Sequence, residues 1–131
     1  APILYSLGNF IFQNDTVKWQ PSYNYDQIGL DHYFTPADFY DKRSDEGKRG
    51  FPADPIYWQS VVAQIKFENG NLSSLDVVPI DMGYGKPRSM TGRPLIASGK
   101  TANQALSRIK ELSEDMGTDV SIDGTRGIVT I

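Results

Sequence analysis

The 131-residue chain contains no cysteine and a single histidine, His32. Without cysteine it can form no disulfide framework, no thiolate metal site and no cysteine nucleophile. One histidine is too few for a histidine-rich metal centre built from this chain alone. No apolar run reaches the ~18 residues that a membrane-spanning helix needs. The formal net charge of −3 argues against nucleic acid as a partner, because the chain as a whole is not basic.

The most apolar stretch lies at the start of the chain and reads Ile3-Leu4-Tyr5-Ser6-Leu7-Gly8-Asn9-Phe10-Ile11-Phe12. It predicts a buried strand over Ile3–Ser6, a bend at Gly8-Asn9 and a short continuation. A strand that is apolar on both faces needs cover on both faces. We therefore expect the chain to be the C-terminal part of a longer protein that supplies this cover. If the chain folds alone, its bare strand edges are expected to pair with a second copy.

Residues 13–59 show no sustained period of two or 3.6 residues, and we interpret them as a long aromatic loop insertion. The density of aromatic side chains argues against disorder in this stretch. One short helix is predicted from Pro36 to about Lys42, because Thr35 suits the N-cap and proline suits the first helical position.

Residues 60–131 carry the regular patterns of the chain. Alternating apolar side chains predict a hairpin of two strands, Ser60–Phe67 and Leu72–Ile80. Asn69-Gly70 between them is typical of a tight hairpin turn. Pro79 lacks an amide N–H and is therefore expected at a sheet edge or at the end of the second strand.

A helix is predicted over Thr101–Met116, with Thr101 and Gln104 as a capping box. Its apolar stripe, spaced by three and four residues, consists of Ala102, Ala105, Leu106, Ile109, Leu112 and Met116. A turn at Asp123-Gly124 then predicts a closing hairpin. These elements predict an α+β segment of residues 1–131, with a mostly antiparallel sheet and one main C-terminal helix.

Basic side chains in two stretches are candidates for binding an anionic ligand such as a polycarboxylate or a phosphate. They are Arg43, Lys48 and Arg49 in the loop, and Lys86, Arg88 and Arg93 after the first hairpin. The alternative is surface charge that balances the acidic residues. Gly83-Tyr84-Gly85-Lys86 is not a Walker phosphate loop, because proline follows the lysine where Ser or Thr is required.

Two polar residues have a functional and a structural interpretation. Asp31-His32 can act as an acid–base or ligand pair, or His32 can be a solvated structural residue. Asn9 can lie on the rim of a cleft, or it can satisfy the backbone at the glycine bend. No residue of the chain is assigned as a catalytic group or as a metal ligand.

The stretch Tyr5–Phe12, which reads YSLGNFIF, resembles the CapA family of capsule synthesis proteins. These proteins act in poly-γ-glutamate biosynthesis and resemble calcineurin-like metallophosphoesterases in fold. Two further stretches are similar to the family, namely Val78–Arg88, which continues to Gly92-Arg93-Pro94, and Arg49–Trp58. The resemblance implies that the chain is a fragment of a metallophosphoesterase-like α/β sandwich.

The resemblance also implies where the chemistry of the parent protein lies. Its divalent metal, Mn²⁺ or Zn²⁺, would be held in the N-terminal half of the parent, and this segment would hold no cofactor and be inactive alone. Residues of this chain that would flank the cleft are Gly8, Asn9 and Phe10, and those that would contact substrate are His32, Arg49, Arg88 and Arg93. The parent would be extracytoplasmic and membrane-associated.

Three functions of this segment stay open at this point. In the first, the parent is a metal-dependent hydrolase and this segment forms the cleft rim. In the second, the segment is a non-catalytic module that binds the anionic polymer or a partner in the synthesis and export complex. The contact surface would then contain aromatic residues such as Trp19, Tyr23, Tyr25 and Trp58. In the third, the segment only closes the structure of the catalytic half.

Overall fold

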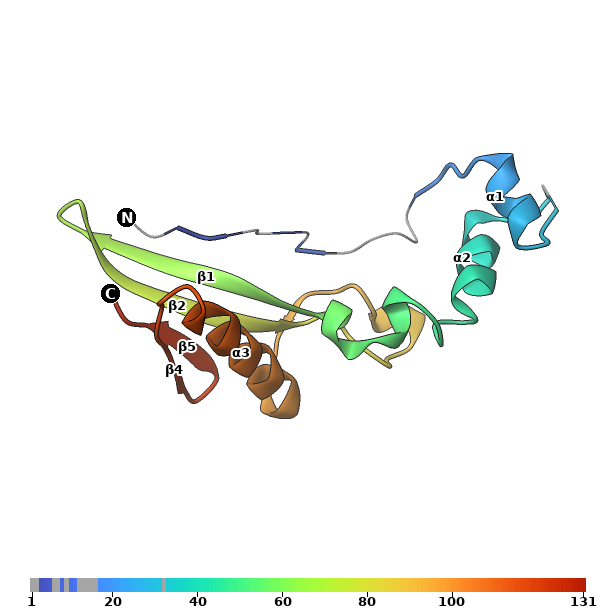
Figure 1. Ribbon diagram of the computed structural model, residues 1–131. Helices are drawn as coiled ribbons and strands as arrows, with labels where there is room; N and C mark the ends of the chain where they lie inside the picture. The colour runs from blue at the N-terminus through green and yellow to red at the C-terminus, as the bar shows by residue number, and fades with distance from the viewer. Residues whose placement is uncertain (1–2, 6–7, 9, 12–16, 32) are drawn as a thin grey trace. The chain divides into compact units, whose positions relative to one another are not determined.

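The computed structural model describes residues 3–5, 8, 10–11, 17–31 and 33–131 of the chain (Figure 1). The chain forms two compact units. The larger unit consists of Ala1–Ile11 and Trp58–Ile131, and the smaller unit of Phe12–Tyr57. Within the described residues, no helix combines the length and the apolarity needed to cross a membrane.

The larger unit contains a five-stranded antiparallel sheet with the order β1-β2-β5-β4, in which β3 also pairs with β2. The strands are β1 Gln59–Glu68, β2 Asn71–Asp81, β3 Leu95–Ile96, β4 Val120–Asp123 and β5 Arg126–Val129. Both hairpins expected from the sequence are confirmed, and with the main helix they confirm the α+β class. Asn69 and Gly70 between β1 and β2 have φ of 51° and 80°, the positive values that a tight hairpin turn requires.

Pro79 lies near the end of β2, as predicted, but β2 is not an edge strand, because other strands pair with it on both sides. Pro79 pairs with Val61 of β1, and β2 continues to Asp81. On the other side of β2, pairing with β5 stops at Val77 and pairing with β3 starts at Ile80. The Pro79 carbonyl accepts the Ala97 N–H at 2.9 Å on that side. The missing proline N–H therefore falls where one neighbouring strand gives way to the next, so no ladder hydrogen bond is lost.

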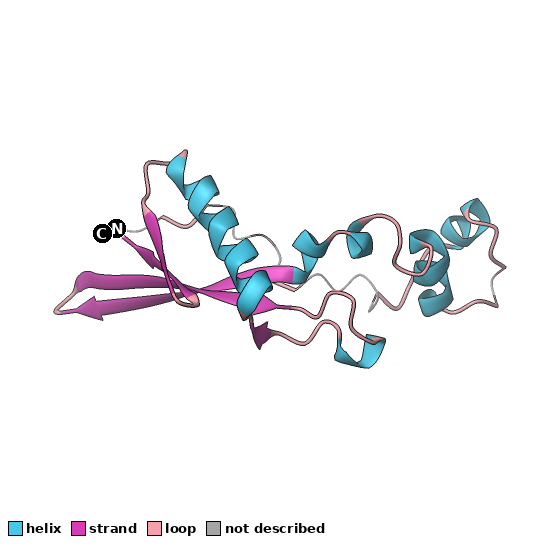
Figure 2. Ribbon diagram, turned by 90° about the horizontal axis from the view of Figure 1, so that it is seen from below, coloured by secondary structure: helices cyan, strands magenta, loops and turns pink. Residues whose placement is uncertain are grey.

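The helix α3, Gly99–Glu114, packs on one face of the sheet (Figure 2). Leu106 is 0% exposed and packs with Leu75 and Val77 of β2. Gly127 of β5 lies beneath it, and a Cβ at that position would come within 3.3 Å of Leu106 Cδ2. The absence of a side chain at Gly127 thus lets the helix approach the sheet closely.

Two features expected of this helix are wrong. The N-cap is Ser98 and not Thr101, because Ser98 has the extended backbone of a cap and its carbonyl already accepts the Ala102 N–H. The apolar stripe is buried only in its first half. Leu112 is 56% exposed and Met116, which lies beyond the helix end, is 59% exposed.

The strand predicted at Ile3–Ser6 is not formed in its described part. Ile3, Leu4 and Tyr5 have no strand structure and are 70%, 46% and 64% exposed; Ser6 lies outside the described residues. Apolar residues supply the faces of a strand, but a strand also needs a partner for its backbone hydrogen bonds. The predicted glycine bend agrees with φ of 61° at Gly8.

The smaller unit has a core of its own between α1, Ser22–Gln27, and α2, Pro36–Ser44. Its buried residues are Tyr25, Phe39 and Tyr40, with Ile28 and Leu30 packed against them. The Phe39 ring lies 5.1 Å from that of Tyr25 and 5.2 Å from that of Tyr40, distances at which aromatic rings attract one another. The helix predicted from Pro36 is confirmed, whereas α1 carried no recognised sequence signal. Two short 3-10 turns follow, Phe51–Ala53 and Pro55–Trp58.

A first prediction tests the core of the larger unit. Leu106→Ala should lower the free energy of unfolding by about 2–5 kcal/mol, because it leaves a cavity in fully buried surroundings. Leu112→Ala removes the same atoms from the exposed part of the same helix and should change it by about 0.5 kcal/mol or less. Urea unfolding followed by circular dichroism measures both. Equal losses in the two variants would contradict the assigned core.

A second prediction concerns the capping box of α2. The Asp38 carboxylate accepts hydrogen bonds from the Thr35 hydroxyl at 2.6 Å and from the Thr35 N–H at 2.8 Å, and these bonds hold the pKa of Asp38 below its usual value. The cap is therefore present above the ordinary carboxyl pKa of about 4 and is lost as the pH falls through the lowered value. Thr35→Ala should raise the pKa of Asp38 and weaken protection of the first-turn amides, as measured by NMR titration and hydrogen exchange.

The matched control for this cap is Ser98→Ala, because Ser98 caps α3 without a side-chain hydrogen bond. It should leave amide protection in the first turn of α3 unchanged. An Asp38 pKa that does not move in Thr35→Ala would show that the threonine hydroxyl is not its cause.

Candidate functional site

Three segments of the larger unit meet at the end of the sheet where β1 begins and β2 ends. They are the residue before β1, the residue after β2 and the chain near Gly92. The Met82 N–H donates to the Trp58 carbonyl at 2.8 Å, and the Gly92 N–H donates to the Met82 carbonyl at 2.9 Å. Residues 82–93 therefore leave and re-enter the fold at one place. We call this segment the basic loop.

Asp81, the last residue of β2, holds the start of the basic loop. Its Oδ1 accepts the Gly83 N–H at 2.7 Å, and its Oδ2 lies 3.1 Å from Lys86 Nζ. Gly83 has φ of 87°, and a Cβ there would stand 2.8 Å from the Met90 carbonyl oxygen. The loop thus folds back on itself around a position that only glycine fits.

The basic loop contains one aromatic and three cationic side chains, and Trp58 contacts it from just before the start of β1. The rings of Trp58 and Tyr84 lie 6.3 Å apart at 59°, and Tyr84 is 46% exposed. Lys86 is half-buried, while Arg88 and Arg93 are exposed. An exposed aromatic ring can offer apolar contact, and an exposed arginine can bind carboxylate or phosphate in a bidentate manner.

The basic loop belongs to a longer stretch in which charge of one sign is segregated. Residues 82–110 contain no aspartate or glutamate and six cationic side chains, which are Lys86, Arg88, Arg93, Lys100, Arg108 and Lys110. The whole chain nevertheless carries a net charge of −3. Cationic side chains are therefore separated from acidic ones along this part of the sequence.

The residues proposed to contact substrate are found in different parts of the chain. Arg88 and Arg93 share the basic loop. Arg49 belongs to the smaller unit, where its Nη2 donates to the Arg43 carbonyl at 2.8 Å. His32 lies outside the described residues.

The expected cleft-flanking residues lie near the start of the chain. Gly8 is exposed, Phe10 is 43% exposed, and Asn9 lies outside the described residues. Among the aromatic residues expected on a contact surface, Trp19 and Tyr23 are 87% and 58% exposed. Tyr25 was wrongly expected there, because it is buried in the core of the smaller unit.

The pairing of Trp58 with Tyr84 was missed from the sequence. The two residues lie far apart along the chain, and only the β1–β2 register brings Trp58 beside Met82. Given the predicted hairpin, the residues just outside its open end were the signal that could have suggested this contact.

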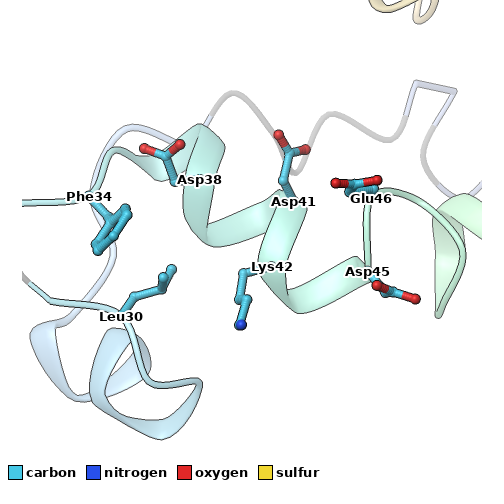
Figure 3. A pocket seen from close by; sticks show the side chains of 7 residues that line it. All are labelled: Leu30, Phe34, Asp38, Asp41, Lys42, Asp45 and Glu46. Atoms are coloured by element: carbon cyan, nitrogen blue, oxygen red, sulfur yellow. The ribbon is translucent and has the colours of Figure 1, made fainter.

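The smaller unit contains an open hollow of about 360 Å³. Figure 3 shows its lining of Leu30, Phe34, Asp38, Asp41, Lys42, Asp45 and Glu46. Its acidic side chains do not converge as metal ligands, because no cluster of three or more histidine, cysteine or carboxylate residues suited to a metal ion occurs in the described part of the chain.

A third prediction tests the fold of the basic loop. Gly83→Ala should destabilise the loop, because the new Cβ meets the Met90 carbonyl and the φ is unfavourable. Gly85→Ala is the matched control, since Gly85 also has positive φ but nothing lies within 4 Å of its Cβ position. Hydrogen exchange at the Gly92 amide should accelerate by about tenfold or more in Gly83→Ala and less in Gly85→Ala. Equal exchange in both would contradict the close approach.

No family model matches the chain. The chain is similar to two proteins of Sinorhizobium fredii, "Uncharacterized protein y4sH" and "Uncharacterized protein y4uA". Each is 32% identical over 149 residues, and the match covers 99% of this chain and 30% of the relative. The chain therefore spans less than a third of the length of these curated relatives.

Proposed function

We propose that this chain is the C-terminal segment of a capsule biosynthesis protein similar to the CapA family, and that it contacts the anionic polymer poly-γ-glutamate. The observation that carries the proposal is the segregated cationic stretch of residues 82–110 in an acidic chain. A polyglutamate chain carries one carboxylate per residue at neutral pH. Several spaced cations bind such a polymer better than one strong site, because each contact releases counterions.

The sequence motifs support the same proposal. Val78–Arg88, one of the stretches that resemble the family, leads directly into the basic loop. The resemblance at Tyr5–Phe12 would add Gly8, Asn9 and Phe10 at the rim of a cleft. The aromatic loop insertion of residues 13–59 would add His32 and Arg49 as substrate contacts. The parent would be extracytoplasmic and membrane-associated.

In this proposal the parent is a metal-dependent hydrolase similar to metallophosphoesterases. Its Mn²⁺ or Zn²⁺ would be held by the N-terminal half of the parent, since the resemblance maps no metal ligand onto this chain. A bound divalent metal lowers the pKa of water and so supplies a nucleophile. The role of this chain in the proposed enzyme is to contact the substrate.

Exposed apolar side chains support the N-terminal half of the parent as a partner. Ile3 and Tyr5 at the start of the chain, Leu112 in α3 and Met116 beyond the end of α3 are all more than half exposed. Exposed apolar side chains are typical of protein contacts where they gather in one patch. In the isolated segment the same surface would favour self-association.

A non-catalytic polymer- or partner-binding module is the second candidate. It is favoured by Trp19 and Tyr23, which expose large apolar groups from the smaller unit, 87% and 58% of their surface. Tryptophan and tyrosine are enriched where proteins bind their partners.

A fourth prediction tests polymer contact directly. The 131-residue chain, titrated with end-labelled poly-γ-glutamate in fluorescence anisotropy, should bind saturably, and the affinity should fall steeply between 50 and 200 mM salt, by about tenfold or more. An uncharged polymer of equal length is the control. Absence of saturable binding at low salt would contradict the proposed contact.

A hydrolysis assay then separates the two candidates. The full-length parent, loaded with Mn²⁺ or Zn²⁺, should cleave phosphoesters or γ-glutamyl polymer if the hydrolase proposal holds. Polymer binding without metal uptake or cleavage would favour the non-catalytic module.

A further inference from the structure

We propose that the basic loop is the docking site for an extended polycarboxylate and that Asp81 competes with the carboxylates of the ligand for Lys86. This inference rests on the proposed polymer contact and deepens it by naming the site. The ligand would replace the Asp81 carboxylate at Lys86, engage Arg88 and Arg93, and lay its aliphatic stem against the Trp58–Tyr84 pair.

The geometry of the loop suits a binding site that is formed in advance. The loop is closed by the hydrogen bonds at Met82, and its start is held by the Asp81–Gly83 hydrogen bond of 2.7 Å. A segment that is already ordered loses little conformational entropy when a ligand binds. Its exposed side chains can therefore contribute to affinity without a refolding cost.

The charge of the loop selects the class of ligand. Asp81 is the last acidic residue before Glu111, and six cations lie between them. Arginine at two of the loop positions offers planar forks that match carboxylate oxygens. A flexible polyanion can contact these cations in succession, as a single small anion cannot.

The aromatic pair favours a polymer with an aliphatic part. Tyr84 is 46% exposed and stands 6.3 Å from Trp58. Methylene groups between successive carboxylates can pack on the ring edge while their charges reach the arginines. Nucleic acid would instead stack its bases on the rings.

The Asp81–Lys86 pair provides the competition. Its atoms are 3.1 Å apart and the two side chains are 24% and 36% exposed. A pair that water reaches is weak and can be exchanged. The same Asp81 carboxylate uses its other oxygen to hold the Gly83 N–H, so exchange of Lys86 leaves the loop closed.

Asp81→Asn separates these two roles. The asparagine carbonyl oxygen can still accept the Gly83 N–H, while the negative charge opposite Lys86 disappears. In anisotropy titrations of the full chain with poly-γ-glutamate, this variant should bind about three- to tenfold more tightly at low salt. The gain should vanish in the double variant Asp81→Asn with Lys86→Gln. Unchanged or weaker binding of the folded single variant would overturn the competition.

Arg88→Gln with Arg93→Gln tests the site itself. The affinity of this variant for the polymer should fall by about tenfold or more. The slope of log affinity against log salt concentration should become shallower by about two. Lys18→Gln with Lys66→Gln removes the same charge from exposed positions outside the loop and should change affinity by about twofold or less. Tyr84→Ala should also weaken binding, with its salt dependence unchanged.

The outcomes distinguish this inference from the function on which it rests. If the unaltered chain binds the polymer and the double arginine variant loses no more affinity than the Lys18→Gln with Lys66→Gln control, the site is wrong and the polymer contact stands. If the unaltered chain does not bind at low salt, both fail. If a single-stranded oligonucleotide of equal charge binds more tightly than the polymer, the loop is a nucleic-acid site and the polycarboxylate assignment is overturned. Far-UV circular dichroism and the urea midpoint show whether each variant is folded.

Discussion

The backbone ladder between β1 and β2 positions most of the larger unit. It runs from Gln59 opposite Asp81 to Glu68 opposite Asn71, and α3 packs across it through Leu106. Its open end places Trp58 beside Met82 and so brings the start of β1 to the base of the basic loop. A change of register by one residue would turn the buried side chains outward and would also separate Trp58 from Tyr84.

The two ends of this ladder differ in character. The turn end carries the tight Asn69-Gly70 turn and the exposed side chain of Phe67. At the open end lies the basic loop, which contains Arg88, Arg93 and Tyr84. The ring of Trp58 packs near that of Tyr84. Loops held by a rigid sheet are common sites of binding. Here Asp81 connects the sheet to the basic loop, because it is the last residue of β2 and its carboxylate accepts the Gly83 N–H of the loop.

Part of the fold and little of the site could be predicted from the sequence. The alternation in β1 and β2 and their Asn-Gly turn reflect interactions between near neighbours, and these predictions are confirmed. The strand predicted over Ile3–Ser6 is not formed in its described part, and the predicted apolar stripe is exposed at Leu112, because apolar periodicity shows which face a segment can bury but not whether a partner is present. Tyr25 was expected on the surface but lies in a core. It belongs to a stretch without apolar periodicity, so nothing in the local sequence marks it as buried.

The sequence by itself determined the α+β class, the hairpins, the main helix and the candidate cations Lys86, Arg88 and Arg93. These depend on local backbone preference, on side-chain periodicity and on composition. Tertiary structure alone decided that Trp58 meets Tyr84, that Asp81 holds both Gly83 and Lys86, and that Arg49 belongs to another unit than Arg88. Trp58 and Tyr84 are distant in the chain and meet only once the strand register is established. The contacts of Asp81 are local in sequence, but they depend on how the basic loop folds back at Gly83.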